Sequence, residues 1–237
     1  MFNQWIDCAQ SWLYPNRCIL CGARGDDGLD LCAACRAELP YNHTACPRCG
    51  LPLPGDLPAL MCGHCLRHPP RYARTLTLCR YTNPADHLIK QLKFHGKLAH
   101  ARLLGELLAA QLATRIETPP QRIIPVPLHR TRLRERGFNQ SVELARPIAA
   151  RFGIPIDVRS CVRVRATPAQ STLPAALRKA NVHNAFHIRH SIPVRHVAIL
   201  DDVITTGATM RACAEALVRS GASQVWGLAL AGDPRPC

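Results

Sequence analysis

The sequence predicts an α/β protein, with a parallel β-sheet flanked by helices and a small cysteine-rich part in front of it. From residue 75 onward, short apolar segments typical of strands alternate with segments of helical periodicity, as in parallel sheets with crossover helices. The chain has 237 residues and 13 cysteines. Its first 70 residues are rich in Cys-x2-Cys pairs, proline and glycine. We therefore expect two domains, residues 1–70 with an N-terminal helix and the cysteine pairs, and residues 71–237.

The cysteine-rich part is expected to form a double zinc ribbon. Each Cys-x2-Cys turn presents two thiolates, and two such turns complete a tetrahedral Zn²⁺ site. Four pairs in one short region are far more specific than a single pair. The simplest arrangement is sequential, with neighbouring pairs on the same zinc ion. The spacing also allows a cross-braced arrangement, with the first and third pairs on one ion and the second and fourth pairs on the other. The expected ligands are Cys18, Cys21, Cys32 and Cys35 for one zinc, and Cys46, Cys49, Cys62 and Cys65 for the other.

Sites with four cysteine ligands are structural, because no position stays open for a substrate. Each ion is expected to contribute about 10–16 kcal/mol to folding, so this part should unfold without metal. Ahead of it, apolar residues recur at helical spacing from Phe2 to Leu13, and Pro15 ends the pattern. We expect a short helix packed on the rest of the chain. A helix bound to a membrane surface is the weaker alternative, since flanking basic residues are missing.

The second part is expected to alternate strands and helices. Alternation of apolar and polar residues predicts its first strand, and Asn83 with Pro84 marks the start of the next helix. Pro127 ends the second strand and begins a loop. The expected strands cover 75–81, 122–126, 197–200 and 224–230, the expected helices cover 98–115, 141–152 and 208–220, and residues 161–181 start as a strand, continue as a polar loop and end in a basic helix.

The segment VAILDDVITTGAT, residues 197–209, is the most informative one. An apolar strand ends in two acids, and a turn and a helix follow. Ligands bind at this end of the strands in open parallel sheets, and the N–H groups of the turn and of the helix N-terminus attract an anion. The two acids repel phosphate but suit neighbouring hydroxyl groups. The segment thus predicts a site for a ribose with a 5′-phosphate, formed by Asp201, Asp202, Thr205, Thr206, Gly207, Ala208 and Thr209.

Two further segments are rich in arginine. The loop after the strand at 122–126 is expected to bind an anion, because planar guanidinium groups match phosphate oxygens. A solvated charged loop is the alternative. The polar loop within 161–181 is expected to close over the site. The first loop contributes Arg130, Arg132, Arg134 and Arg136, and the second, mobile loop contributes Arg163, Arg165, Thr167, Gln170 and Arg178. We assign no catalytic residue from the sequence.

The segment VAILDDVITTGAT resembles the phosphoribosyl-pyrophosphate (PRPP) motif of type I phosphoribosyltransferases. The resemblance implies that the acid pair holds the ribose hydroxyls, that the TTGAT loop holds the 5′-phosphate, and that Mg²⁺ accompanies PRPP. With the four cysteine pairs and the segments LIKQLKFHGK, VPLHRTRLRERGFNQS, RATPAQSTL and RKANVHNAF, the chain resembles the ComF family of bacterial competence proteins over essentially its whole length. That family implies a type I phosphoribosyltransferase fold and a role in the uptake or use of external DNA.

The composition adds constraints on partners and location. The net charge of +14, from 30 Lys and Arg against 16 Asp and Glu, favours polyanionic partners. An aromatic content of 5% argues against an extensive stacking surface for single-stranded nucleic acid. Apolar runs are too short for a membrane span, and the N-terminus lacks the features of a signal peptide. We therefore expect a cytoplasmic protein whose cysteines bind metal rather than form disulfides.

These observations leave two functions. In the first, the protein binds PRPP or a phosphoribosyl nucleotide and acts in competence, with single-stranded DNA and a helicase-type protein as candidate partners. In the second, it is an active PRPP-dependent phosphoribosyltransferase of nucleotide metabolism. The sequence identifies neither the acceptor, nor turnover, nor the oligomeric state. The zinc ribbons can also serve as a hood over the site, which is compatible with both functions.

Overall fold

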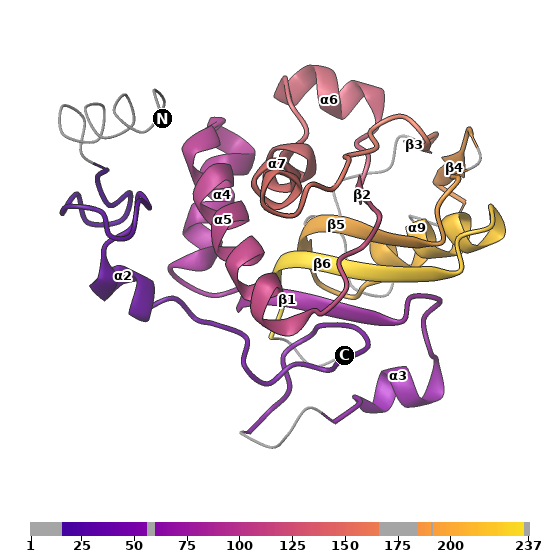
Figure 1. Ribbon diagram of the computed structural model, residues 1–237, viewed down its shortest axis with the longest axis horizontal. Coiled ribbons are helices and arrows are strands. Elements are labelled where there is room, and N and C mark those ends of the chain that lie inside the picture. The colour runs from indigo at the N-terminus through magenta and orange to yellow at the C-terminus, as the bar shows by residue number, and fades with distance from the viewer. Residues whose placement is uncertain (1–15, 56–59, 166–183, 191, 235–237) are drawn as a thin grey trace. The chain divides into compact units, whose positions relative to one another are not determined.

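The computed structural model describes residues 16–55, 60–165, 184–190 and 192–234 (Figure 1). The chain divides into two compact units, residues 1–39 and residues 40–237. The second cysteine group therefore belongs to the same unit as the β-sheet. The expected N-terminal helix lies outside the described residues, and the domain division at residue 70 stays a prediction.

The smaller unit is built around its first four cysteines. Gly22 adopts a left-handed conformation with φ of 78°, and its N–H donates to the carbonyl of Cys18 at 2.8 Å, which closes the first turn. Helix α2 (Ala33–Ala37) begins after Cys32, whose Sγ accepts the N–H of Cys35 at 3.4 Å. Both turns thus direct their thiol groups to one centre.

The larger unit contains a four-stranded parallel sheet in the order β1-β6-β5-β2. Its strands are nearly continuously buried, as expected for a parallel sheet covered on both faces. The predicted parallel α/β fold is therefore confirmed. The four strands are β1 (Arg74–Arg80), β2 (Arg122–Pro125), β5 (His196–Ile204) and β6 (Gln224–Gly232).

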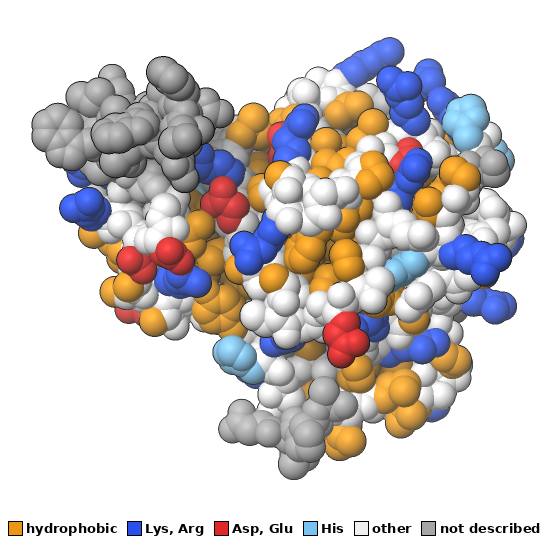
Figure 2. All heavy atoms as spheres, in the orientation of Figure 1, with side chains coloured by type: hydrophobic (Ala, Val, Ile, Leu, Met, Phe, Trp, Pro, Cys, Tyr) orange, Lys and Arg blue, Asp and Glu red, His pale blue; other side chains and the backbone are white. Residues whose placement is uncertain are grey.

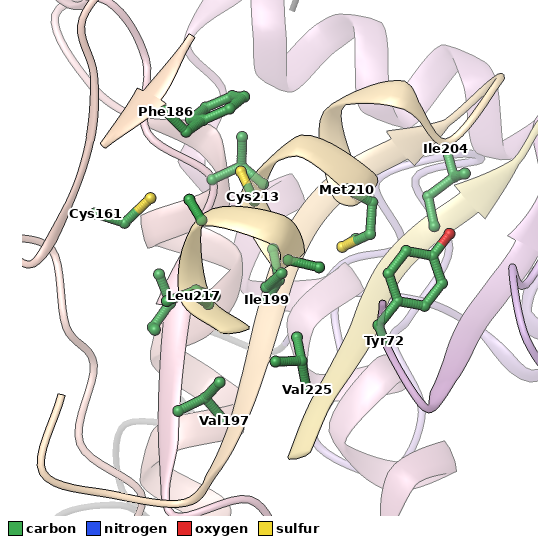
Figure 3. Packing of buried hydrophobic residues seen from close by; sticks show 14 of the residues in the cluster. Tyr72, Cys161, Phe186, Val197, Ile199, Ile204, Met210, Cys213, Leu217 and Val225 are labelled. Carbon is green, nitrogen blue, oxygen red and sulfur yellow. The ribbon is translucent and has the colours of Figure 1, made fainter. Parts of the chain in front are cut away.

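Helices cover both faces of this sheet. On one face, α5 (Leu98–Arg115) packs on α7 (Gln140–Phe152), with α4 (Ala85–His95) beside α5. On the other face, α9 (Ala208–Arg219) packs on β5 and β6, with its buried side chains directed at those of the strands (Figure 3). Among the described residues, no helix is long and apolar enough to cross a membrane.

Two elements differ from the sequence-based expectation. The segment with Arg130 and its neighbours, expected as a loop, forms helix α6 (Arg130–Arg136). The ring of His129 accepts the N–H of Thr131 at the start of α6, and Gly137, with φ of 81°, ends it. The strand β4 (Phe186–Ile188), which the sequence did not indicate, pairs antiparallel with β3 (Cys161–Arg163). The basic helix expected near residue 178 lies outside the described residues.

The second cysteine group, with helix α3 (Gly63–Arg67), is hydrogen-bonded to β1. Asn42 Nδ2 donates to the carbonyl of Gly50 at 3.0 Å and lies 2.6 Å from Thr77 Oγ1. The Thr77 hydroxyl donates to the same carbonyl at 2.7 Å. Cys46, Cys49, Cys65 and Tyr72 join one apolar cluster with Ile204 and Met210, which flank the turn after β5. This cysteine group and that turn therefore share a core.

Candidate functional site

The eight predicted cysteine ligands form two clusters of four in sequential pairing. Within each cluster all sulfur atoms lie within 4.8 Å of one another. The Sγ–Sγ distance is 3.7 Å for Cys21 and Cys32, and 3.8 Å for Cys49 and Cys62. Four sulfurs at about 2.3 Å from a tetrahedral zinc ion stand about 3.8 Å apart. Both clusters therefore fit Zn²⁺, and the cross-braced pairing is wrong.

Hydrogen bonds in the second cluster favour the thiolate form of Cys46. The N–H of Cys62 donates to Cys46 Sγ, and the N–H of Cys65 donates to Cys62 Sγ, each at 3.4 Å. The Cys49 thiol and the N–H groups of Cys62, Cys49 and Arg48 lower the pKa of Cys46 to about 4, although burial opposes them, and the bond between the two thiols raises the pKa of Cys49. With four thiolates around the ion, no position stays open for substrate, so the role is structural.

Strand β5 carries the acid pair Asp201 and Asp202 close to its carboxyl end. Neighbouring side chains of a strand point to opposite faces. Asp201 shares a face with Val197 and Ile199, which belong to the cluster under α9. Asp202 points to the other face, where it forms an ion pair with Lys93 of α4. The two acids thus have different surroundings: Asp202 is buried, and Asp201 is partly exposed.

The turn after β5 has the geometry of an anion site. Gly207 is the N-cap residue of α9 and has φ of 72°, a conformation that favours glycine. It has no side chain to cap the helix; the N–H of Ala208 donates to the hydroxyl oxygen of Thr206 at 3.4 Å, and the N–H groups that follow it in the first turn of α9 are available to an anion. Thr205, Thr206 and Thr209 are partly exposed around this turn. The acid pair and the uncapped helix N-terminus therefore meet at one end of β5.

The electrostatic surroundings couple the acid pair to three basic side chains. Burial raises the pKa of Asp201 to about 6, and the positive charges of Lys93 and Arg163 oppose that rise. Burial lowers the pKa of Lys93 to about 8, opposed by Asp201 and reinforced by the charge of Arg136. At neutral pH the site thus holds charged groups of both signs.

The four arginines of α6 do not form one cradle. Residues two apart on a helix lie on nearly opposite sides. Arg136 donates a hydrogen bond to the side-chain oxygen of Gln140 and lies toward Lys93. Arg132 pairs with Glu135 at 3.8 Å, whereas Arg130 and Arg134 are exposed. The charge of Arg136 therefore acts on Lys93 beside the acid pair, and the charge of Arg132 acts on Arg136 and Arg163.

A cavity of about 730 Å³ lies between the start of α6, the start of α7 and β3. Its volume is in the range of small-molecule sites. Leu133, Val142 and Val162 contribute apolar walls, and Arg163 and Arg189 contribute positive charge. Arg163 links the cavity to the acid pair through its charge, which opposes the rise in the pKa of Asp201, whereas neither acid lines the cavity.

The structure thus groups some of the sequence-predicted residues and leaves others aside. Of the predicted mobile-loop residues, Arg163 and Arg165 are described, and Thr167, Gln170 and Arg178 lie outside the described residues. Sequence reasoning missed Lys93, which had a detectable signature: it lies four residues after Ile89, on the apolar stripe of α4. It also missed Arg189, for which no sequence pattern exists.

Two family models match parts of this chain. The family model of a double zinc ribbon domain matches residues 9–66, and that of a phosphoribosyl transferase domain matches residues 139–235. Among solved structures, the purine phosphoribosyltransferase of Pyrococcus horikoshii Ot3 aligns with 21% identity and a TM-score of 0.34, over 56% of this chain and 72% of that one.

Curated relatives match most of the chain. The DNA utilization protein YhgH of Salmonella typhimurium is 42% identical over 203 residues, which cover 83% of this chain and 88% of that protein. The protein of the same name in Escherichia coli K12 is 40% identical over 90% of this chain and 96% of its own length. Competence protein F of Haemophilus influenzae is 34% identical over 91% of this chain and 97% of its own length. With a double zinc ribbon, a phosphoribosyl transferase domain and these relatives, the chain belongs to the ComF family.

Proposed function

We propose that the protein binds PRPP, or a nucleotide with the same phosphoribosyl group, at the carboxyl end of β5. One observation carries the proposal. An acid pair at the end of this strand stands a few residues before the uncapped N-terminus of α9 at Gly207. Both lie within the segment that matches the phosphoribosyl transferase domain. Few ligands other than a ribose phosphate need hydroxyl acceptors and an anion site this close together.

Each group then has a role that follows from its chemistry. The N–H groups around Gly207 and the hydroxyls of Thr205, Thr206 and Thr209 bind the 5′-phosphate. The acidic end of β5 accepts hydrogen bonds from the ribose hydroxyls. Arg136 and Arg163 supply positive charge for the pyrophosphate. Mg²⁺ bound with PRPP would neutralise further phosphate charge.

We infer a role in DNA utilisation from the relatives named DNA utilization protein and competence protein F. The net charge of +14 supports a polyanionic partner, and basic side chains outnumber acidic ones on the face in Figure 2. Single-stranded DNA and a helicase-type protein are the candidate partners, in the cytoplasm. DNA affinity across salt tests this: each phosphate contact should give a log–log slope of about −0.7, and a flat response would exclude direct binding.

The second candidate is PRPP-dependent transfer to an acceptor. The 730 Å³ cavity favours it, because Arg163, whose charge acts on Asp201, lines the cavity, which has room for a second group. Release of pyrophosphate from PRPP in the presence of nucleobases or amines would establish turnover. No release with any acceptor would leave the protein as a binder.

Ligand-induced stabilisation of the zinc-loaded full chain tests the binding proposal. PRPP with Mg²⁺ at about 100 times its dissociation constant should add about 2.7 kcal/mol. Asp201→Asn with Asp202→Asn should abolish the effect. Asp86→Asn serves as the control, because Asp86 pairs with Lys90 on α4 and not with the site. Absence of a shift in the unmodified protein would overturn the proposal.

A further inference from the structure

The segment around α3 in the second cysteine group carries an apolar patch at the surface. Three large hydrophobic side chains of residues 60–66 are exposed: Leu60 at 61%, Met61 at 42% and Leu66 at 65%. Hydrophobic side chains lie open to solvent in the part of Figure 2 where Figure 1 places α3. Apolar groups that are exposed side by side, rather than scattered, mark contact surfaces in soluble proteins. These three residues form the apolar patch.

The zinc ligands hold the apolar patch in place. The N–H of Cys65 donates to Cys62 Sγ at 3.4 Å, and the N–H of Leu66 donates to the carbonyl of Cys62 at 3.1 Å. The N–H of His68 donates to the carbonyl of His64 at 2.8 Å, which closes the end of α3. A surface that is fixed in advance loses little conformational freedom on binding, so it favours association.

The first cysteine group shows that zinc binding does not require this exposure. Helices α2 and α3 have the same construction, because each begins after a cysteine whose Sγ accepts the N–H of the next ligand at 3.4 Å. Before α2, Leu31 is fully buried, whereas its equivalent Met61 is exposed. Behind the last ligand, Arg36 pairs with Asp27 at 3.6 Å, and its equivalent is the exposed Leu66. The apolar patch is therefore a property of the second group alone.

The surroundings of the apolar patch are basic. Residues 57–85 include four arginines and no Asp or Glu. Arg67 and Arg71 are exposed, and neither takes part in an ion pair with another residue of the described ranges. Arg211 of α9 donates to the carbonyl of His68 at 2.9 Å, which brings a third guanidinium group to the end of α3. A matching partner has an apolar centre with negative charges around it.

The side chains of the apolar patch favour a protein over a nucleic acid as the partner. Single-stranded nucleic acids place their bases on aromatic side chains, and the patch consists of two leucines and a methionine. Leucine and methionine suit the apolar face of a helix, because methionine adapts its shape to the side chains that it contacts.

We propose that the segment around α3 docks another protein through an acidic amphipathic helix of that protein. The apolar face of this helix covers the apolar patch, and its carboxylates pair with Arg67 and Arg71. The second cysteine group then has two tasks, since its sulfurs hold the fold and its outer side binds the partner. This inference goes beyond the proposed phosphoribosyl site and does not depend on it.

Binding of a designed peptide to the zinc-loaded full chain tests the proposal. The probe is a fluorescent helical peptide of about five turns, with leucines on one face and glutamates elsewhere. It should bind at least about 10-fold more tightly than the same peptide with glutamine in place of glutamate. Leu66→Ser should weaken binding at least about 10-fold, the scale of one leucine that loses its contact. Leu98→Ser is the control, at a leucine of α5 that is 48% exposed, and should bind as the unmodified protein does.

Reversed charges provide a second test. Arg67→Glu with Arg71→Glu should weaken binding of the acidic peptide at least about 10-fold and should favour a peptide with lysine in place of glutamate. Arg115→Glu, at an exposed position at the end of α5, should change neither affinity. Equal binding of the acidic and glutamine peptides, or an unchanged preference in the double variant, would overturn the proposal.

The same variants distinguish other occupants of the apolar patch. If Leu66→Ser weakened binding of single-stranded DNA as strongly as binding of the peptide, the patch would be a nucleic-acid surface. If it dissociated an oligomer of the unmodified protein in sedimentation, the patch would join two copies of this chain. Either result would refute docking of another protein.

Zinc content and PRPP-induced stabilisation of Leu66→Ser should match those of the unmodified protein, so a structural defect is recognised by its effect on both. If the variant loses zinc, hydrogen exchange in the unmodified protein decides the question. The acidic peptide should slow exchange in residues 60–71 and leave residues 98–115 unchanged. Slower exchange only outside residues 60–71 would overturn the proposal, whether or not the protein binds PRPP.

Discussion

Gly207 is the residue on which the anion site depends most directly. Its φ of 72° is unfavourable for any residue with a Cβ, and a Cβ there would lie 3.5 Å from the Tyr72 hydroxyl. We expect Gly207→Ala to cost about 1–2 kcal/mol of stability and to abolish most of the PRPP-induced stabilisation, because the N–H groups of the turn shift. Thermal unfolding with and without PRPP measures both effects.

Gly153→Ala is the matched control for this prediction. Gly153 has φ of 64° and ends α7, and a Cβ there would meet nothing within 4 Å. It should lose similar stability and keep the response to PRPP. If both variants keep that response, the turn at Gly207 is not the anion site.

Asp201 illustrates a conflict between stability and function at a single residue. Burial raises its folded-state pKa to about 6, above the ordinary value of 3.8. A raised carboxyl pKa means that the folded protein binds the proton more tightly than the unfolded chain, so stability falls as the pH rises through this interval. We expect ligand-free Asp201→Asn to have a higher melting temperature than the unmodified protein above pH 6, and little difference below about pH 4. A variant that is less stable at pH 7 would contradict the raised pKa.

At the scale of elements, the attachment of the second cysteine group to β1 is open to test. Asn42 is fully buried and joins the carbonyl of Gly50 to the hydroxyl of Thr77. We expect Asn42→Ala to cost about 1–3 kcal/mol, because Thr77 loses a partner and a small cavity forms. His43→Ala, at an exposed neighbouring position, should cost little. Chemical denaturation of the three proteins provides the comparison, and equal stabilities would refute a supporting role for Asn42.

Regular elements were predictable where the pattern is local. Helix α5 occupies the predicted 98–115, and β1 and β6 lie within a few residues of the predicted strands. In these segments one apolar face or one buried run decides the conformation, so neighbouring residues carry the information. The sequential grouping of the cysteines was also the simplest inference from their spacing, and it is confirmed.

The remaining differences arise from contacts that a local pattern does not contain. The charge of the arginine-rich segment suggested a loop. The segment forms helix α6 instead, because His129 caps its start and Gly137 ends it. Strands β3 and β4 have three residues each, and their pairing joins Cys161 to Ile188 across a long stretch of sequence. Lys93 lies in the segment LIKQLKFHGK, but its ion pair with Asp202 depends on how α4 packs.

At the scale of the whole molecule, the two cysteine clusters differ in what surrounds them. The first lies within residues 1–39, a unit of its own, where the thiol groups form the centre. The second lies within residues 40–237, and its members Cys46, Cys49 and Cys65 share an apolar cluster with Tyr72 and with residues of α9. Figure 3 shows the ring of Tyr72 directed toward Ile204, next to the turn that we assign to the phosphate. Metal in the second cluster should therefore affect the ligand site, whereas metal in the first should not.

Paired serine variants test this difference between the clusters. Loss of one structural zinc removes about 10–16 kcal/mol of binding free energy from the part that it holds. We expect Cys46→Ser with Cys49→Ser to lower the melting temperature of the larger unit and to abolish stabilisation by PRPP. Cys18→Ser with Cys21→Ser should lose one equivalent of zinc and keep the response to PRPP. Zinc content and melting curves with and without PRPP distinguish the variants. If Cys18→Ser with Cys21→Ser abolished PRPP binding as well, the site would depend on residues 1–39 in a way that the shared core of the second cluster does not explain.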